Sequence, residues 1–247
     1  VQDEELAYIQ NLSGLTLLEL GHTNISDEGM QYVSGLTNVR RLNLNGSAVG
    51  DEGLSYLTDL NRVEELILNR TQVSDEGLSF IQHMTSLTYL DLWMLNVSDE
   101  GMQYLAGFTN LTELGIEDTQ IGDEGLRYLA GMSQLRDLNL ENNDITDAGL
   151  AWLANLTNLA VLNLDDTYIT EAGLAALAGL SNLSELSLPL QIGPDGLNYL
   201  RNSASLEKLI SQRVGLRPLS IAITGGGRPL PGAHFSLKGN PGDGNQD

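Results

Sequence analysis

The chain has 247 residues, no cysteine and a formal net charge of −21. The absence of cysteine excludes disulfide bonds and thiolate metal sites, and the negative charge disfavours nucleic acid and anionic membrane surfaces. Residues 1–200 hold 30 acids and six arginines, a net of −24, whereas residues 201–247 have a net of +3. We therefore expect solubility, and either basic partners or divalent cations. No apolar run approaches the length of a membrane span, so we expect no membrane insertion.

A unit of 24 residues recurs along most of the chain. Successive units open at Leu15, Val39, Val63, Leu87, Leu111, Leu135, Leu159, Leu183 and Leu206, and only the last step is one residue shorter. Residues 1–14 match the second half of such a unit, so we predict a partial first repeat there. Residues 15–211 then form a solenoid of eight full units plus a terminal strand.

Each unit has a strand pattern followed by a helix pattern. Leu18 and Leu20 alternate with Glu19, which is typical of a strand with one buried face. Met30, Val33 and Leu36 recur at spacings of three, which favours a helix. An aspartate stands just before most helices, and we expect it to cap the free N–H groups and oppose the helix dipole. These aspartates are Asp27, Asp51, Asp75, Asp99, Asp123 and Asp147.

One unit cannot bury its apolar face alone, so stacked neighbours must supply the core. The prediction is an α/β solenoid with a concave parallel β-sheet and short outer helices. A glycine and an aromatic residue recur once per unit on the helical side, as Gly101 and Tyr104 do in the fourth unit. We interpret the glycines as sites of close approach between turns, and the aromatic residues as braces between neighbouring helices.

The repeated pattern L-x-x-L-x-L-x-x-T-x-I-x-D-E-G-L-x-Y-L resembles the leucine-rich repeat family, in its 24-residue bacterial and ribonuclease-inhibitor-like form. The resemblance covers about residues 3–211. It implies a non-catalytic binding scaffold, but an analogy of fold does not name a ligand.

The character of the chain changes after Leu188, since all six prolines follow it. We expect a linker at 212–218, a β-rich segment at 219–238 and a flexible tail at 239–247. The run from Arg228 to Ala233, RPLPGA, resembles the opening of carboxypeptidase-regulatory-like β-sandwich modules. The alternative is a β-hairpin that caps the solenoid. The first alternative implies a longer extracellular or cell-surface protein, and a cytoplasmic location stays open.

Catalytic chemistry has little support in the sequence. His22, His83 and His234 lie far apart, and no nucleophile–base pair, phosphate loop or metal-ligand spacing is present. The recurrent Asp-Glu pairs lack the alternating acids of a calcium loop. We therefore predict no catalytic residue, no metal site and no cofactor.

The concave face of the fourth unit is the strongest candidate site. Counted from the opening residue, positions three, five, seven and eight of each unit should face the concavity or its rim. The fourth unit places Tyr89, Asp91, Trp93 and Met94 there, and Leu95 replaces the usual threonine. Exposed aromatic residues at the centre of a surface are typical interface anchors.

Acidic side chains from the following units lie beside this aromatic pair. We name them the acidic field: Glu113, Glu117, Asp118, Asp137, Glu141, Asp165 and Asp166. The predicted ligand-binding residues are Tyr89, Trp93, Met94, Asp91, Arg70, Ile67, Glu113, Glu117, Asp118 and Glu141. We expect a protein or peptide partner of basic character, steered by this field. The alternatives are a carbohydrate-binding or adhesive surface module, and an architectural spacer.

Overall fold

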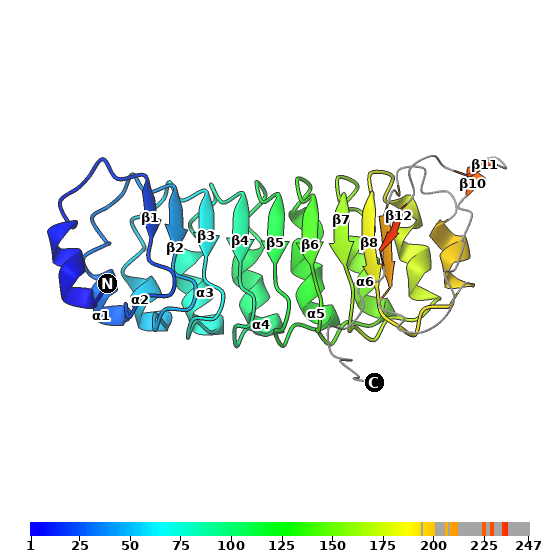
Figure 1. The fold of residues 1–247 in the computed structure, drawn as a ribbon, viewed down its shortest axis with the longest axis horizontal. Coiled ribbons are helices and arrows are strands. Elements are labelled where there is room, and N and C mark those ends of the chain that lie inside the picture. Colours follow the sequence, from blue (N-terminus) through cyan, green and yellow to red (C-terminus); the bar gives the residue numbers. More distant parts are fainter. Residues whose placement is uncertain are drawn as a thin grey trace, which may run out of the picture.

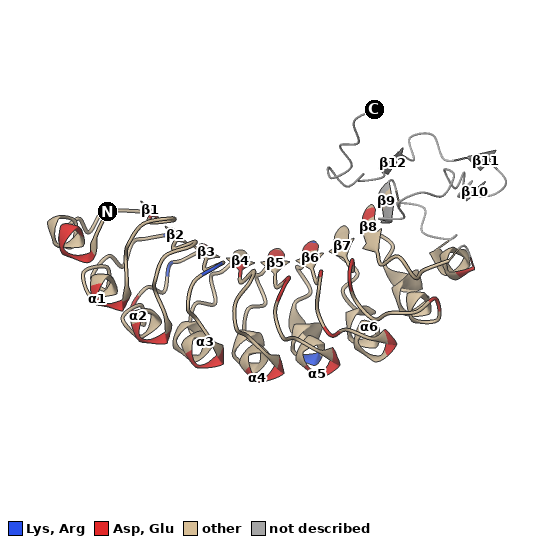
Figure 2. Ribbon diagram, turned by 60° about the horizontal axis from the view of Figure 1, so that its bottom comes forward, with Lys and Arg blue, Asp and Glu red and all other residues tan. Residues whose placement is uncertain are grey.

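A computed structural model shows a curved solenoid with one long parallel sheet (Figure 1). It describes residues 1–193, 195–200, 206, 208–211, 224–225, 228–229 and 234–236. The strands line the inner side of the curve and the helices form the outer side (Figure 2). The predicted architecture is therefore confirmed.

The sheet runs in the order β1 to β9 and then β12. Its strands are β1 (Leu17–Glu19), β2 (Arg41–Asn43), β3 (Glu65–Ile67), β4 (Tyr89–Asp91), β5 (Glu113–Gly115), β6 (Asp137–Asn139), β7 (Val161–Asn163), β8 (Glu185–Leu188), β9 (Lys208–Ser211) and β12 (His234–Ser236). From β1 to β8, equivalent positions of successive units are paired, so that Leu66 lies beside Leu90 and Leu90 beside Leu114. Each concave position therefore forms a row across the sheet.

The outer elements are short, and several are 3-10 helices. They are η1 (Asp3–Tyr8), α1 (Asp27–Met30), α2 (Asp51–Ser55), α3 (Asp75–Ile81), α4 (Asp99–Met102), η2 (Gln103–Leu105), α5 (Asp123–Leu126), η3 (Arg127–Gly131), α6 (Asp147–Leu153), η4 (Gly173–Gly179) and η5 (Gly196–Leu200). Between this layer and the sheet lies one continuous strip of buried leucine, isoleucine, valine and methionine side chains. In the fourth unit, Leu90 and Leu92 of the strand side meet Met102 and Leu105 of the helical side in this strip.

The recurrent aspartates form hydrogen bonds between units, whereas the sequence pattern predicts that they cap their own helices. Each one is the first residue of its helix, and its carboxylate bonds to the next unit instead of capping its own helix. Asp75 accepts the backbone N–H of Ser98 at 2.8 Å and the Ser98 hydroxyl at 2.7 Å. The same two hydrogen bonds join Asp3 to Ser26, Asp51 to Ser74, Asp123 to Thr146 and Asp147 to Thr170. Only the backbone hydrogen bond joins Asp27 to Gly50 and Asp99 to Gly122, since glycine has no hydroxyl. The capping prediction is therefore wrong, and we call this contact the inter-unit carboxylate bridge.

The recurrent glycine leaves room for this bridge. A Cβ atom on Gly101 would collide with the Asp75 carboxylate and would also crowd Leu78 at 3.1 Å. Gly53 stands in the same relation to Asp27, and Gly149 to Asp123. The expectation of a close approach between turns is confirmed, and the bridge is its physical reason.

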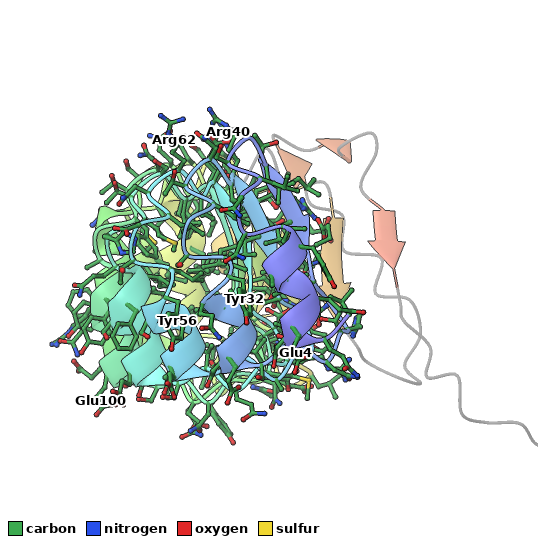
Figure 3. The ribbon with its side chains drawn as sticks, turned by 90° about the vertical axis from the view of Figure 1, so that its left-hand side faces the viewer. Glu4, Tyr32, Arg40, Tyr56, Arg62 and Glu100 are labelled. Carbon is green, nitrogen blue, oxygen red and sulfur yellow. The ribbon has the colours of Figure 1, made fainter. Side chains whose placement is uncertain are left out.

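The outer aromatic row is used mainly for packing. Tyr32, Phe80, Tyr104 and Tyr128 are partly buried against the core. Tyr32 and Tyr56 lie on the helical side (Figure 3). Tyr56 is exposed, whereas Tyr32 is partly buried. The four partly buried side chains pack against the core, whereas Tyr8, Tyr56, Trp152 and Tyr199 are exposed. Bracing between neighbouring helices stays a prediction.

The C-terminal segment is described only in part. β10 (Thr224–Gly225) pairs antiparallel with β11 (Arg228–Pro229), and β12 adds to the solenoid sheet beside β9. The predicted linker at 212–218 and the tail at 239–247 lie outside the described residues. The two alternatives for residues 219–238, a capping hairpin or the start of a β-sandwich module, stay predictions.

Replacing Asp75 by Ala tests the bridge. The change leaves the Ser98 N–H without its charged acceptor, so we expect the free energy of unfolding to fall by about 2 kcal/mol. Urea unfolding followed by circular dichroism measures it. Glu76→Gln is the matched control, because Glu76 is the exposed neighbour, and should change stability by less than about 0.5 kcal/mol. Equal stability of both variants would show that the bridge carries no energy.

Candidate functional site

The rim of the concave face is a row of tight turns that follow the strands. The residue at position eight adopts a positive φ in every unit from the first to the seventh: His22, Gly46, Arg70, Met94, Asp118, Asn142 and Asp166. In the first six of these units, its N–H donates to the position-seven carbonyl of the next unit, as Met94 does to Glu117 at 3.1 Å. Gly, Asn and Asp adopt this left-handed backbone conformation most readily. Arg and Met rarely adopt it, so Arg70 and Met94 are unusual residues at this position.

Trp93 is held between its two neighbouring units. The Arg70 guanidinium stacks over the indole ring, 4.9 Å from its centroid. The indole Nε1–H donates to Asp118 Oδ2 at 2.7 Å, and Asn142 in turn donates to the other oxygen of Asp118. The ring is partly buried and fixed from both sides. It therefore forms a rigid part of the surface, with one face already covered by Arg70.

Met94 is the exposed apolar residue of the fourth unit. It is 47% exposed. Leu95, by contrast, is only 3% exposed and belongs to the core. Position nine is also buried in other units, as Asn143 and Thr167 show. The unusual Leu95 is therefore explained by packing, and Trp93 and Met94 remain as the surface departures.

A second group lies deeper on the sheet, around Tyr89 and Asp91 of β4. Asp91 Oδ1 accepts the Trp93 N–H at 3.0 Å. Burial raises the pKa of Asp91 above its ordinary range. Burial, followed by the negative charges of Asp91, Glu113 and Glu117, raises the pKa of Tyr89. These side chains share one desolvated, negative environment.

Glu117 folds over the bare backbone of Gly115. Its Oε2 lies 3.0 Å from the place where a Gly115 Cβ would be, and Asp91 Oδ1 lies 3.5 Å from that place. Glu117 Oε2 is buried and has no hydrogen-bond partner among the described residues. Burial, with Asp91, Glu141 and Asp118 adding negative charge, raises the pKa of Glu117 to about 7. The site therefore contains a carboxylate that lacks a counter-charge.

All ten predicted residues lie across β3 to β6 and the turns that follow these strands. Ile67 pairs with Asp91 in register, and Tyr89 pairs with Glu113. Trp93 contacts both Arg70 and Asp118 directly. Glu141 is not part of this group, and its carboxylate accepts a hydrogen bond from the Asn163 side-chain amide at 2.8 Å.

The acidic field is smaller than predicted, since Asp165 is only 6% exposed. Two residues were missed by sequence reasoning: Gly115, which makes room for Glu117, and Asn142, which fixes Asp118. The sequence does carry a signal for Gly115, because it is the one glycine at position five in the seven units that contain β1 to β7.

The described part of the chain contains no group of three or more His, Cys, Asp or Glu side chains arranged to hold a metal ion. It also contains no helix long and apolar enough to cross a membrane.

Comparison with known proteins agrees with this geometry. Leucine-rich repeat models match residues 133–189 and residues 14–34, 35–57 and 109–130. The crystal structure of internalin C2 from Listeria monocytogenes is similar, with 30% identity, a TM-score of 0.69, and coverage of 85% of this chain and 84% of that chain. An internalin F from the same species has 23% identity and a TM-score of 0.63, over 85% of this chain and 71% of that chain.

The fold extends to more distant proteins. The plant peptide hormone receptor RGFR1 in complex with RGF2 has 17% identity and a TM-score of 0.51, over 83% of this chain and 38% of that chain. No curated protein matches the sequence. The chain belongs to the leucine-rich repeat family. Within it, this is an internalin-like bacterial binding scaffold.

The buried carboxyl of Glu117 predicts a pH dependence of stability. Its folded-state pKa lies above its ordinary value of 4.5, so folding favours the protonated form. This stabilisation is full below about pH 4.5 and is lost as the pH rises through about 7. Wild type should lose about 1 kcal/mol relative to Glu117→Gln between pH 5 and pH 8, after allowance for solvent screening. Urea unfolding at the two pH values measures the difference.

The control for this measurement is Glu124→Gln, which removes an exposed acid on the outer side. It should leave the pH dependence as in wild type. Parallel curves for wild type and Glu117→Gln would mean that Glu117 ionises freely in the folded protein.

Proposed function

We propose that this protein recognises a basic protein or peptide through the concave face of its third to sixth units. Met94 and Trp93 form the anchor, and the acidic field beside them attracts and orients the partner. The observation that carries the proposal is the exposed Met94 side chain beside a tryptophan braced by Arg70 and Asp118. A fixed aromatic platform loses little conformational entropy when a partner binds.

The charge on this surface supports a basic partner. None of the ion pairs formed within the described residues involves Asp91, Glu113, Glu117 or Asp118. The arginines that do form ion pairs lie mainly in the second unit, where Arg41 bridges Glu19 and Glu65. A cationic side chain placed above Gly115 would supply the counter-charge that Glu117 lacks, and burial would strengthen that attraction.

Similarity to solved structures supports a binding role and leaves the ligand open. Leucine-rich repeat proteins commonly serve as scaffolds for protein recognition, and the likeness to internalin C2 covers most of both chains. We also propose a bacterial extracellular or cell-surface location, which that likeness supports.

Carbohydrate binding has weaker support. Sugar rings stack on an open aromatic face, and Arg70 already covers one face of Trp93. The stacked guanidinium would have to leave before a sugar could use that face. The contact therefore favours a protein or peptide partner.

Removing the anchor tests the proposal. Trp93→Asn and Met94→Asn install residues that occupy the same positions in other units, namely Asn69 and Asn142. Asn also tolerates the positive φ at position 94, so the fold should be kept. Peptides selected on the wild type from a displayed random library should be basic and should bind the double variant at least about tenfold more weakly. Fluorescence anisotropy measures the affinities.

Tyr168→Asn is the matched control, since Tyr168 is an exposed aromatic of the seventh unit and Asn96 occupies the equivalent position of the fourth. It should leave binding unchanged. The affinity for wild type should fall steeply with added salt. Selected peptides without basic residues, or equal binding to all variants, would contradict the proposal.

A further inference from the structure

The five methionines of this protein differ sharply in exposure. Met30, Met84, Met102 and Met132 are each 0% exposed and lie in the solenoid core. Met94 is 47% exposed. A thioether reacts with an oxidant only where the oxidant can reach the sulfur, so exposure separates one methionine from four.

The backbone keeps Met94 at the surface. Its φ of 56° places it in the turn after β4, and its N–H is bonded to the Glu117 carbonyl of the next unit. The side chain that follows, Leu95, is the one that enters the core. A buried position for Met94 would require this turn to be rebuilt, so the exposure of this residue belongs to the folded state.

We propose that Met94 is a site of selective, reversible oxidation by peroxides. The thioether sulfur attacks one oxygen of hydrogen peroxide and forms an S–O bond while the O–O bond breaks. The leaving hydroxide takes up the proton that the transferred hydroxyl group gives up, and it departs as water. The sulfur is oxidised by two electrons to the sulfoxide, and the peroxide is reduced by two. A thiol-dependent sulfoxide reductase returns the side chain to methionine.

Oxidation changes the chemistry of the anchor. The sulfoxide is polar and accepts hydrogen bonds, so an apolar contact on the exposed part of the fourth unit is replaced by a hydrated one. Trp93, Arg70 and Asp118 keep their mutual contacts, since none of them depends on the Met94 sulfur. The modification therefore weakens partner binding without unfolding the scaffold. This consequence rests on the proposed function, whereas the position of the oxidised residue does not.

The experiment treats the folded protein with hydrogen peroxide and follows each methionine-containing peptide by mass spectrometry. Met94 should gain one oxygen at least about tenfold faster than the buried four, which react only through local opening of the structure. In urea, all five should react at similar rates. Met94→Leu should lose the fast phase while keeping the far-ultraviolet circular dichroism of the wild type. If a buried methionine reacts as fast as Met94 in the folded protein, Met94 is not a selective site of oxidation.

A separate binding measurement tests whether oxidation of Met94 weakens partner binding. The basic peptide selected on the wild type is the probe, and it should bind oxidised protein at least threefold more weakly. Treatment with methionine sulfoxide reductases of both stereospecificities should restore the affinity. For Met94→Leu, the affinity for the peptide should be the same before and after peroxide treatment, whatever its value before treatment. Unchanged affinity after complete oxidation of Met94 would overturn the consequence and leave the proposed function standing. A wild type that binds no selected peptide would overturn the proposed function, while the oxidation site is still decided by mass spectrometry.

Discussion

The rest of the solenoid depends on the inter-unit carboxylate bridge. This contact joins the first helical residue of one unit to the start of the helix in the next unit. A carboxylate such as Asp75 accepts both the N–H and the hydroxyl of Ser98, and Gly101 leaves the space in which it does so. A helix of four residues, such as α4, cannot stabilise itself in water. Its position is fixed by the neighbouring unit through this charged, directional contact, repeated along the outer side.

This constraint separates stability from recognition. The inter-unit carboxylate bridges lie on the outer side and the apolar strip lies in the interior. The side chains at the concave positions therefore form neither the bridges nor the core. Their side chains can vary while the strand register stays the same, as the pairs Glu65–Tyr89 and Tyr89–Glu113 illustrate. The fourth unit uses this freedom to present Trp93 and Met94, and the fifth places an unpaired carboxylate beside them. In the proposed function, recognition therefore depends on a local departure from a regular repeat.

The sequence predicts the period, the parallel sheet, the buried rows and the concave positions, because each follows from spacing alone. It also places Arg70 beside Met94, one unit apart, whereas in the structure the Arg70 guanidinium stacks over the Trp93 ring. It does not predict which atoms meet across units. Asp75 reads as a helix cap because its partner, Ser98, lies 23 residues further on. Leu95 reads as a surface departure because only the structure shows that its position is buried. Asp165 is misplaced for the same reason, and the fold of Glu117 over Gly115 depends on a side-chain conformation that no spacing encodes.

The central claim is that recognition takes place on the concave rim of the fourth and fifth units. Amide hydrogen exchange, measured with and without the basic peptide selected on the wild type, tests it most directly. We expect slower exchange in the turns around Met94 and Asp118 when the peptide is bound, and no change at the bridge amides of the outer side, such as Ser98. Protection confined to the outer helices, or to units remote from the fourth, would contradict the account.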